Sequence, residues 1–356
     1  MKPMLPNMFR SETEFVRWLC KQLPGRVSGL RLGIGDDAAI VDVGPHRGVV
    51  LKSDMCIENV HFNRRLHPPL SVGHRALARP LSDLAAMGAV PRFALVSLAL
   101  SRTTGPGWVE EFYAGFLALA KRFDVTLVGG DVAMTSAPTV VDVTVTGAVP
   151  LGAELRRSGA KPGDRIFVSG ELGLAALGLR LLRLQGHVPT RHKRGFSRVG
   201  RGDPSWVTAV CAQLYPEPRC KLGRLLSAGN LASATIDLSD GLSTDLRHLC
   251  EASGVGARVS EELLPLPPTL KYPRRTRLAL ALHGGEDHQL LFTVPRGKEI
   301  PTSLEGVTLH RIGEIRRSKD VLLAANDGTQ APLPPRGYDH FRHLTQGHAR
   351  SSGSAG

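Results

Sequence analysis

The stretch from Gly33 to Val41 sets two adjacent aspartates, Asp36 and Asp37, directly before an apolar run. Aspartate forms strands poorly and is costly to bury without a partner. The stretch is therefore either a surface turn that begins a strand or one wall of a cation site. Neighbouring residues in extended backbone point to opposite sides, so only one carboxylate can readily face a bound ion. We expect that residue to be Asp37, with Asp36 holding the turn.

The same glycines also satisfy the loose dinucleotide-binding fingerprint. Gly33, Gly35 and Ala38 have the required spacing, and Asp54 lies where a ribose-binding acid would stand. That fingerprint must open a helix whose N-terminus receives the pyrophosphate. Residues 38–43 instead have the pattern of a strand, and the two aspartates would repel a pyrophosphate. We therefore disfavour a dinucleotide site.

Composition limits the class of protein. The chain of 356 residues is 42% hydrophobic and 22% charged, which is ordinary for a globular protein with room for two cores. No apolar run reaches the roughly 18 residues of a membrane-spanning helix, so we expect no membrane segment. The five cysteines form no C-x-x-C pair. This disfavours a disulfide framework or structural zinc and favours the cytoplasm.

The formal net charge of +13 fits either a solvated basic surface or a protein with an anionic partner. Much of the excess lies in a basic insert, residues 180–203, where only one aromatic side chain, Phe196, stands among the arginines. One aromatic residue is too few for a surface that stacks bases. We interpret the insert as a basic loop and disfavour nucleic acid as a partner.

Helix and strand patterns mix without strict alternation. A capping box at Ser11 and Glu14 opens a first helix, and Ser71 is expected to cap a second, which runs through Met87 with a kink at Pro80. Strands are expected over 48–52, 92–100, 125–128 and 139–149.

This order predicts an α/β (α+β) fold of two mixed-sheet domains. We expect the domains to span residues 1–150 and 151–344, followed by a disordered tail over 345–356.

Further aspartates stand beside glycines or at the ends of expected elements, and one lies inside an expected helix; these are Asp54, Asp83, Asp131, Asp237 and Asp240. If such carboxylates converged without a cation, each pair about 5 Å apart would repel by roughly 3 kcal/mol at an effective dielectric near 20. A converging set therefore implies a divalent cation, and oxygen ligands alone favour magnesium held together with substrate phosphates. The chain has neither a P-loop nor the protein-kinase motifs, so we expect phosphoryl transfer by positioning and charge neutralisation.

Nine short motifs along the chain resemble those of the thiamine-monophosphate kinases, in the same order. They are GIGDDAA (33–39), SDM (53–55), NVHF (59–62), LSDLAAMG (81–88), GGD (129–131), RSGAKPGD (157–164), IDLSDG (236–241), GGED (284–287) and GYDHF (337–341). That family belongs to the superfamily of aminoimidazole ribonucleotide synthetase and selenophosphate synthetase.

The resemblance implies ATP-dependent phosphorylation of thiamine monophosphate to thiamine diphosphate by direct in-line transfer, with several Mg²⁺ ions. It also implies a homodimer whose N-terminal domains pair their sheets. The implied magnesium ligands are Asp37, Asp54, Asp83, Asp131, Asp237 and Asp240, of which Asp131 and Asp240 are the implied catalytic residues. The implied ATP contacts are Gly130, Asp131, Arg157 and Ser239. The implied substrate contacts are His61, Glu286 and Tyr338.

Three positions depart from the family pattern. Lys52 stands where relatives tend to have a metal-binding hydroxyl, so it either removes a ligand or contacts phosphate. Val132 replaces a usual threonine, and His288 a common aromatic residue. Two alternatives remain open. One is another superfamily activity, on a ribonucleotide amide or on selenide, although Cys20 lies inside an expected helix, which disfavours the selenide reaction. The other is a module that binds nucleotide or nucleic acid without turnover.

Overall fold

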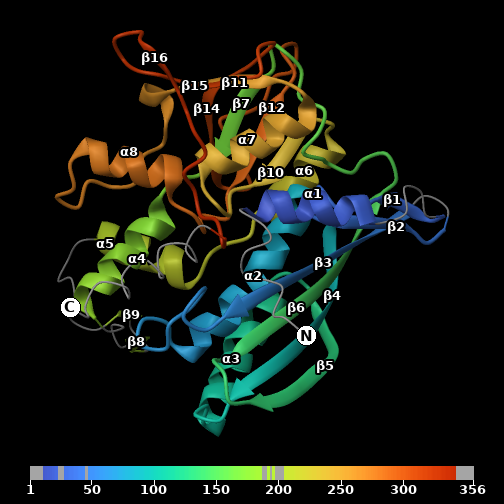
Figure 1. The fold of residues 1–356 in the computed structure, drawn as a ribbon, viewed down its shortest axis with the longest axis vertical. Helices are drawn as coiled ribbons and strands as arrows, with labels where there is room; N and C mark the ends of the chain where they lie inside the picture. Colours follow the sequence, from blue (N-terminus) through green and yellow to red (C-terminus); the bar gives the residue numbers. More distant parts are fainter. Residues whose placement is uncertain are drawn as a thin grey trace, which may run out of the picture.

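Two sheets organise the chain in the computed structural model, which describes residues 11–22, 28–44, 47–186, 191–192, 195–196 and 204–341 (Figure 1). The first sheet has the order β1-β2-β3-β6-β4-β5, and only the β4–β5 pair is parallel. Its strands are β1 (Leu30–Leu32), β2 (Ala39–Asp42), β3 (Arg47–Ile57), β4 (Val90–Ser101), β5 (Thr126–Thr135) and β6 (Val140–Pro150).

The second sheet has the order β10-β12-β7-β14-β11-β15-β16, with β13 paired to β14 beside it, and only β11 and β15 run parallel. Its strands are β7 (Arg165–Ser169), β10 (Ala234–Asp237), β11 (Gly256–Ser260), β12 (Leu290–Val294), β13 (Ser303–Leu304), β14 (Val307–Arg316), β15 (Val321–Ala324) and β16 (Gln330–Pro332). Both sheets are mixed, which confirms the expected fold class.

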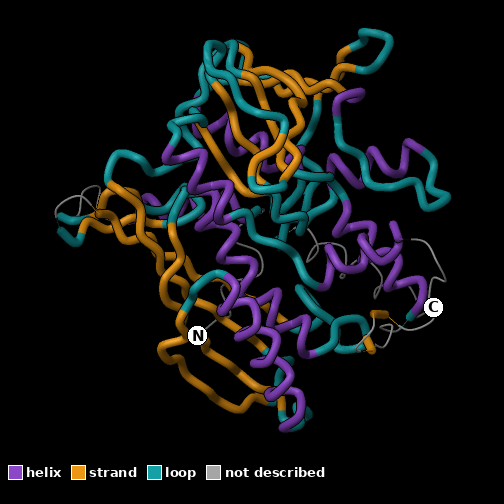
Figure 2. Tube along the Cα trace, turned by 180° about the vertical axis from the view of Figure 1, so that it is seen from behind, coloured by secondary structure: helices purple, strands orange, loops and turns teal. Residues whose placement is uncertain are grey.

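The helices lie mainly around and between the two sheets (Figure 2). They are α1 (Glu12–Gln22), α2 (Pro69–Ala86), α3 (Pro106–Arg122), α4 (Leu174–Gln185), α5 (Pro204–Leu214), α6 (Cys220–Ala228), α7 (Leu242–Ser253) and α8 (Arg274–His283), with a 3₁₀ turn at Glu261–Leu263 and a small hairpin of β8 (Arg191–His192) and β9 (Gly195–Phe196). None of the helices in the described residues is long and apolar enough to span a bilayer.

Several local expectations are corrected. The strand expected over 48–52 continues to Ile57, so Asp54 lies inside β3 rather than at its end. The strand expected over 125–128 likewise continues to Thr135, which places Asp131 in the middle of β5. Helix α2 begins at Pro69, so Ser71 is not its cap, and it runs through Pro80. The tail over 345–356 and most of the basic insert lie outside the described residues.

Two expectations at the chain start agree with the structure. Residues 39–42 form strand β2, so the helix that a dinucleotide fingerprint requires is not there. The backbone N–H of Glu14 donates to Ser11 Oγ over 3.2 Å, as the capping box predicts.

Helix α2 connects the two sheets. It packs against α3 and against strands β3 and β6 of the first sheet, and also against β10 and α6 of the second half. One buried core runs through this contact, since Leu84 and Val143 belong to the same cluster as Phe167 and Phe292. A second cluster, which includes Ile236, fills the space under α7.

The other face of the first sheet is uncovered and partly apolar. On β3 and β4 the side chains that alternate with the buried ones include Leu51, Met55, Phe93 and Leu95, which are 36–54% exposed. The neighbouring strand β5 adds Val128, which lies beside Phe93 and Leu95, whereas its exposed Val132 and Met134 pair with Leu98 and Leu100 and so stand on the opposite face. Contiguous exposed apolar surface of this kind marks an interaction site.

Candidate active site

A cavity of about 1290 Å³ opens between the two halves of the chain. Strand β3 and helix α2 contribute Lys52 and Asp83 to its lining. The end of β10 contributes Asp237, and the loops before β12 and after β16 contribute Glu286 and Tyr338. Most of the aspartates and substrate contacts expected from sequence therefore converge here.

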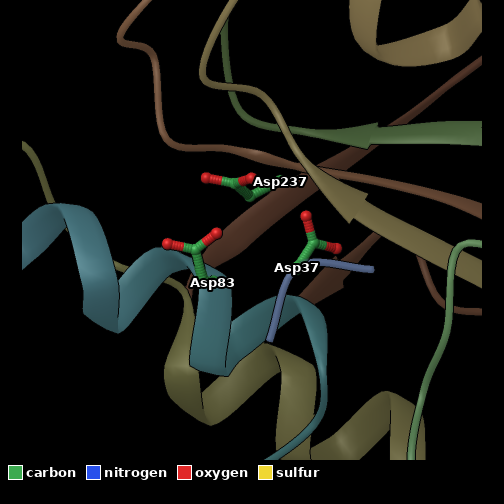
Figure 3. A group of neighbouring side chains, drawn as sticks. All are labelled: Asp37, Asp83 and Asp237. Atoms are coloured by element: carbon green, nitrogen blue, oxygen red, sulfur yellow. The ribbon is translucent and has the colours of Figure 1, made fainter. Parts of the chain in front are cut away.

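Three carboxylates form the tightest acidic group, and they come from separate elements (Figure 3). Asp37 lies in the turn before β2, Asp83 in α2, and Asp237 at the end of β10. Each is buried, and one oxygen from each lies within 4.8 Å of the others. Carboxylates this close repel unless a cation or protons neutralise them.

The ionisation of this group depends on its surroundings. Burial, opposed by Arg157, raises the pKa of Asp37 to about 7. Burial also raises the pKa of Asp83 well above its usual value, although Lys52 acts against the shift. Asp37 Oδ2 is buried and has no hydrogen-bond partner among the described residues. An unpaired buried carboxylate oxygen beside two other carboxylates fits a divalent cation, so the residues present suit the magnesium that the family resemblance implies.

Basic side chains of the protein already neutralise part of the negative charge of this group. Arg157 donates to Asp37 Oδ1 through Nε over 3.1 Å and through Nη2 over 2.5 Å. Lys52 Nζ lies 2.8 Å from Asp83 Oδ1. Asp36 points the other way and accepts the backbone N–H groups of Asp37 and Arg157. Asp36 thus holds the turn, as the alternation of extended backbone predicts.

Asp54 lies next to this group on β3 and pairs with a residue that sequence reasoning missed. Arg79 Nη2 donates to Asp54 Oδ1 over 3.1 Å. Burial acts to raise the pKa of Asp54, but Arg79 and Lys52 outweigh it and hold this pKa below its usual range. Asp54 is therefore ionised near neutral pH.

Asp240 and Ser239 lie on the loop between β10 and α7, and both line the cavity. Burial, with Glu12 and Asp237 nearby, raises the pKa of Asp240 to about 7. Gly241 precedes α7, and no side chain caps this helix. Asp245 Oδ2 instead accepts the backbone N–H groups of Asp240 and Gly241 over 3.1 and 3.0 Å.

Two glycines let the loops before β12 and after β16 pack onto the loop between β10 and α7. A Cβ at Gly285 would lie 2.7 Å from the carbonyl oxygen of Ser239, and a Cβ at Gly337 would lie 2.3 Å from that of Asp240. Real Cβ atoms do not approach backbone that closely, so a larger residue at either position would push the loops apart. The loops carry Glu286 and Tyr338, which explains why these residues follow glycines.

A buried network holds Glu286. Arg75, 1% exposed, donates from Nη2 to Glu286 Oε1 over 2.6 Å and to the carbonyl oxygen of His61 over 3.1 Å. Gln213 Nε2 donates to Glu286 Oε2 over 3.0 Å. Burial is outweighed by Arg75 and Arg79, so the pKa of Glu286 falls to about 2. Sequence reasoning missed both arginines. Arg75, Arg79 and Asp83 follow one another at steps of four residues, which puts all three on one face of the helix.

The remaining substrate contacts expected from sequence form a group of rings. The His61 and His340 ring centroids are 5.0 Å apart, and those of Tyr338 and His340 are 4.7 Å apart. Burial, with Arg79 nearby, lowers the pKa of His61 to about 3, so its ring is neutral at physiological pH. A neutral imidazole beside two other rings suits a planar, aromatic ligand.

Gly130 and Asp131 lie away from the cavity, and Asp37, although it belongs to the acidic group, is not among the lining residues either. The register pairs Asp54 with Val143, Val143 with Val96, and Val96 with Gly130. Three strand spacings, about 14 Å, therefore separate Gly130 from Asp54. Both residues are exposed on β5.

Comparison with known proteins identifies the family. Two family models match the chain, the AIR synthase related protein N-terminal domain over residues 35–149 and its C-terminal domain over residues 161–323. Thiamine-monophosphate kinase of Bacillus subtilis (strain 168) is 35% identical over 330 residues, which cover 88% of this chain and 95% of that protein. The chain belongs to the thiamine-monophosphate kinase family. The kinase of Escherichia coli (strain K12) is 36% identical over 318 residues, covering 88% of this chain and 92% of that one.

Solved structures agree with membership of the thiamine-monophosphate kinase family. AaThiL complexed with AMPPCP and TMP is 30% identical with a TM-score of 0.78, and the match covers 93% of this chain and 97% of that one. The thiamine-monophosphate kinase of Stenotrophomonas maltophilia K279a is 33% identical with a TM-score of 0.71, over 89% and 96% of the two chains. E. coli HypE, a hydrogenase maturation protein, is 19% identical with a TM-score of 0.63 and shares the fold alone. The resemblance inferred from the nine motifs is confirmed.

Proposed function

We propose that this protein phosphorylates thiamine monophosphate to thiamine diphosphate, with ATP as the phosphoryl donor and Mg²⁺ as the cation. The observation that carries the proposal is the buried group of Asp37, Asp83 and Asp237, of which Asp83 and Asp237 line a cavity of about 1290 Å³. Such a group needs a cation or protons to offset its repulsion, and carboxylate oxygens suit magnesium that arrives with nucleotide phosphates. The complex of the relative AaThiL with AMPPCP and TMP supports this choice of substrates.

In the proposed reaction, a phosphate oxygen of thiamine monophosphate attacks the γ-phosphorus of ATP in line. The bond from that phosphorus to the β–γ bridging oxygen breaks, and ADP leaves. Magnesium, when bound, supplies neutralisation of the charge on the phosphate oxygens. In this chain Asp37, Asp83 and Asp237 would hold it, and Asp54 and Asp240, the other carboxylates expected as ligands, line the same cavity.

Other residues would orient the substrates. Ser239 stands shortly before α7, whose N-terminus favours a phosphate group. Arg157 fixes Asp37 and adds positive charge for the nucleotide. On the other side of the cavity, His61 and Tyr338 offer rings to the thiamine heterocycles, and Glu286 offers a carboxylate to their polar or cationic atoms.

We propose that Gly130 and Asp131 act in a second copy of the chain. They lie about three strand spacings, or 14 Å, from Asp54, too far to share a ligand with it. They stand beside the uncovered apolar surface that includes Phe93 and Leu95. A homodimer formed through this face would cover that surface and let Asp131 serve as a ligand in trans.

We also propose that the two expected domains have different roles. Residues 1–150 would bind nucleotide and form the dimer, and residues 151–344 would complete the active site. A cytoplasmic location is in keeping with five cysteines that form no disulfide.

A discontinuous assay tests the function. The purified protein is incubated with ATP, Mg²⁺ and thiamine monophosphate, and thiamine diphosphate is detected by fluorescence after oxidation to its thiochrome derivative. We expect product that depends on all three additions, with thiamine itself as the control acceptor that lacks a phosphate. A folded, magnesium-loaded protein that makes no thiamine diphosphate would contradict the proposal. Binding of nucleic acid that is unaffected by Asp237→Asn would instead favour the module without turnover.

A further inference from the structure

The acidic wall of the cavity contains cations supplied by the chain itself. Lys52 Nζ lies 2.8 Å from Asp83 Oδ1, and Arg79 Nη2 lies 3.1 Å from Asp54 Oδ1. Asp54 and Asp83 are two of the carboxylates that would otherwise bind divalent ions. Each already has a positive charge at the distance of a direct, charge-assisted hydrogen bond.

These two cations are held in place from more than one side. Arg79 Nη1 also lies 3.5 Å from Glu286 Oε1, so its guanidinium bridges two carboxylates, and its side chain is 16% exposed. Lys52 stands two residues before Asp54 on β3, and its side chain is 26% exposed. A divalent ion between Asp54 and Asp83 would have to displace both cations or lie against their positive charge. Either course is costly in a partly desolvated cavity.

Within the described residues, the group of Asp37, Asp83 and Asp237 keeps ligand atoms free for an ion from solution. Asp37 Oδ2 is buried without a partner in the described part of the chain, and Asp83 has a second oxygen beside the one that Lys52 occupies. His288 is 3% exposed, lines the cavity, and has no hydrogen-bond partner at either ring nitrogen among the described residues. Its Nδ1 lies 3.7 Å from Asp237 Oδ2. Asp37 and His288 thus both carry buried atoms without a hydrogen-bond partner close to Asp237, which points to a ligand there.

We propose that Lys52 and Arg79 are tethered counterions that take the places of divalent cations, so that the nucleotide-free chain binds one divalent ion, at Asp37, Asp83 and Asp237. That the ion is magnesium and that phosphates bind beside it rests on the proposed function, but the number of bound ions can be counted without turnover. Lys52 and Arg79 then contribute permanent charge to phosphate binding that a free ion would otherwise supply.

Counting Mn²⁺ ions tests the proposal. Mn²⁺ accepts the same oxygen ligands as Mg²⁺ and also imidazole nitrogen, and its free form is measured by electron paramagnetic resonance. We expect the nucleotide-free wild-type chain to bind one ion tightly. Lys52→Met and Arg79→Met should each add a second ion, because each frees a carboxylate. Asp237→Asn should weaken the first site by about tenfold or more, since it removes one of three charged ligands.

Lys21→Met is the matched control. Lys21 also lines the cavity, yet none of the ion pairs found in the described residues joins it to the acidic group, so loss of its charge should leave the count at one. Circular dichroism checks that each variant is folded. Two or more tight ions on the wild-type chain would overturn the proposal whether or not the variants fold, as would a count of one on folded Lys52→Met and Arg79→Met. The kinase assay is independent, so a count of one without thiamine diphosphate formation would reject the function and keep this inference.

Discussion

Replacement of Arg75 by methionine tests the network that holds Glu286. The guanidinium of Arg75 is 1% exposed and bonds Glu286, the carbonyl oxygen of His61 and the carbonyl oxygen of Gln213. Breaking a buried ion pair by removing one partner costs roughly 3–5 kcal/mol. The Glu286 side chain is 24% exposed and keeps Arg79 and Gln213, so we expect the lower end, about 3 kcal/mol.

Urea unfolding followed by both fluorescence and circular dichroism measures this loss. The double variant Arg75→Met, Glu286→Gln should recover part of the stability, because it removes the carboxylate that the single variant leaves short of a partner. The matched control is Arg122→Met, which breaks the pair with Glu217, whose side chains are 55% and 41% exposed. That control should cost at most about 1 kcal/mol.

The kinetic consequence separates positioning from simple loss of stability. Arg75 also holds the backbone of His61, so we expect the KM for thiamine monophosphate to rise far more than the KM for ATP. The reasoning is refuted if folded Arg75→Met is as stable as the Arg122→Met control, or if Glu286→Gln makes no difference in the Arg75→Met background.

Three further results are expected. Asp240→Asn should lower kcat by about a hundredfold, because charge stabilisation at the transferred phosphate is worth several kcal/mol; turnover near wild type would remove Asp240 from the site. Inactive Asp131→Asn and Asp237→Asn chains, unfolded and refolded together, should regain about a quarter of wild-type turnover if Asp131 acts in trans, since half of the dimers would be mixed and one site in each intact; no recovery would favour action within one chain. The pKa of Glu286 is depressed to about 2, so its contribution to stability is present above its ordinary pKa near 4.5 and is lost as the pH falls towards 2; the free energies of unfolding of wild type and Glu286→Gln should differ most above pH 4.5 and converge as the pH falls towards 2.

The sequence predicted the acidic group because short-range features carry it. Glycines and strand ends around Asp37 and Asp237 are visible locally, and the ordered motifs added Asp83, which looks like a surface residue on its own. The two mixed sheets followed from elements that do not alternate strictly. Asp36 and Asp37 could be told apart by the alternation of extended backbone alone.

What the sequence could not supply was long-range pairing. Arg75 and Arg79 look like ordinary charges in a helix, and their partners are Glu286, 211 residues after Arg75, and Asp54 on another strand. Strand β14 was missed because charged residues and a bulge near Gly313 interrupt its pattern. The distance from Asp131 to the cavity depends on the order of strands in the sheet, which no local pattern encodes.

Helix α2 and the core around it have a consequence for how the molecule unfolds and moves. The same buried cluster contains Leu84 and Val143 from the first half and Phe167 and Phe292 from the second. Neither half could keep its apolar surface covered after the other melted, so heating should give one cooperative transition despite the two sheets. A chain cut near residue 151 should stay associated as a nicked molecule. Substrate capture would then depend on local loop movement over a fixed cavity, rather than on hinge rotation of one half against the other.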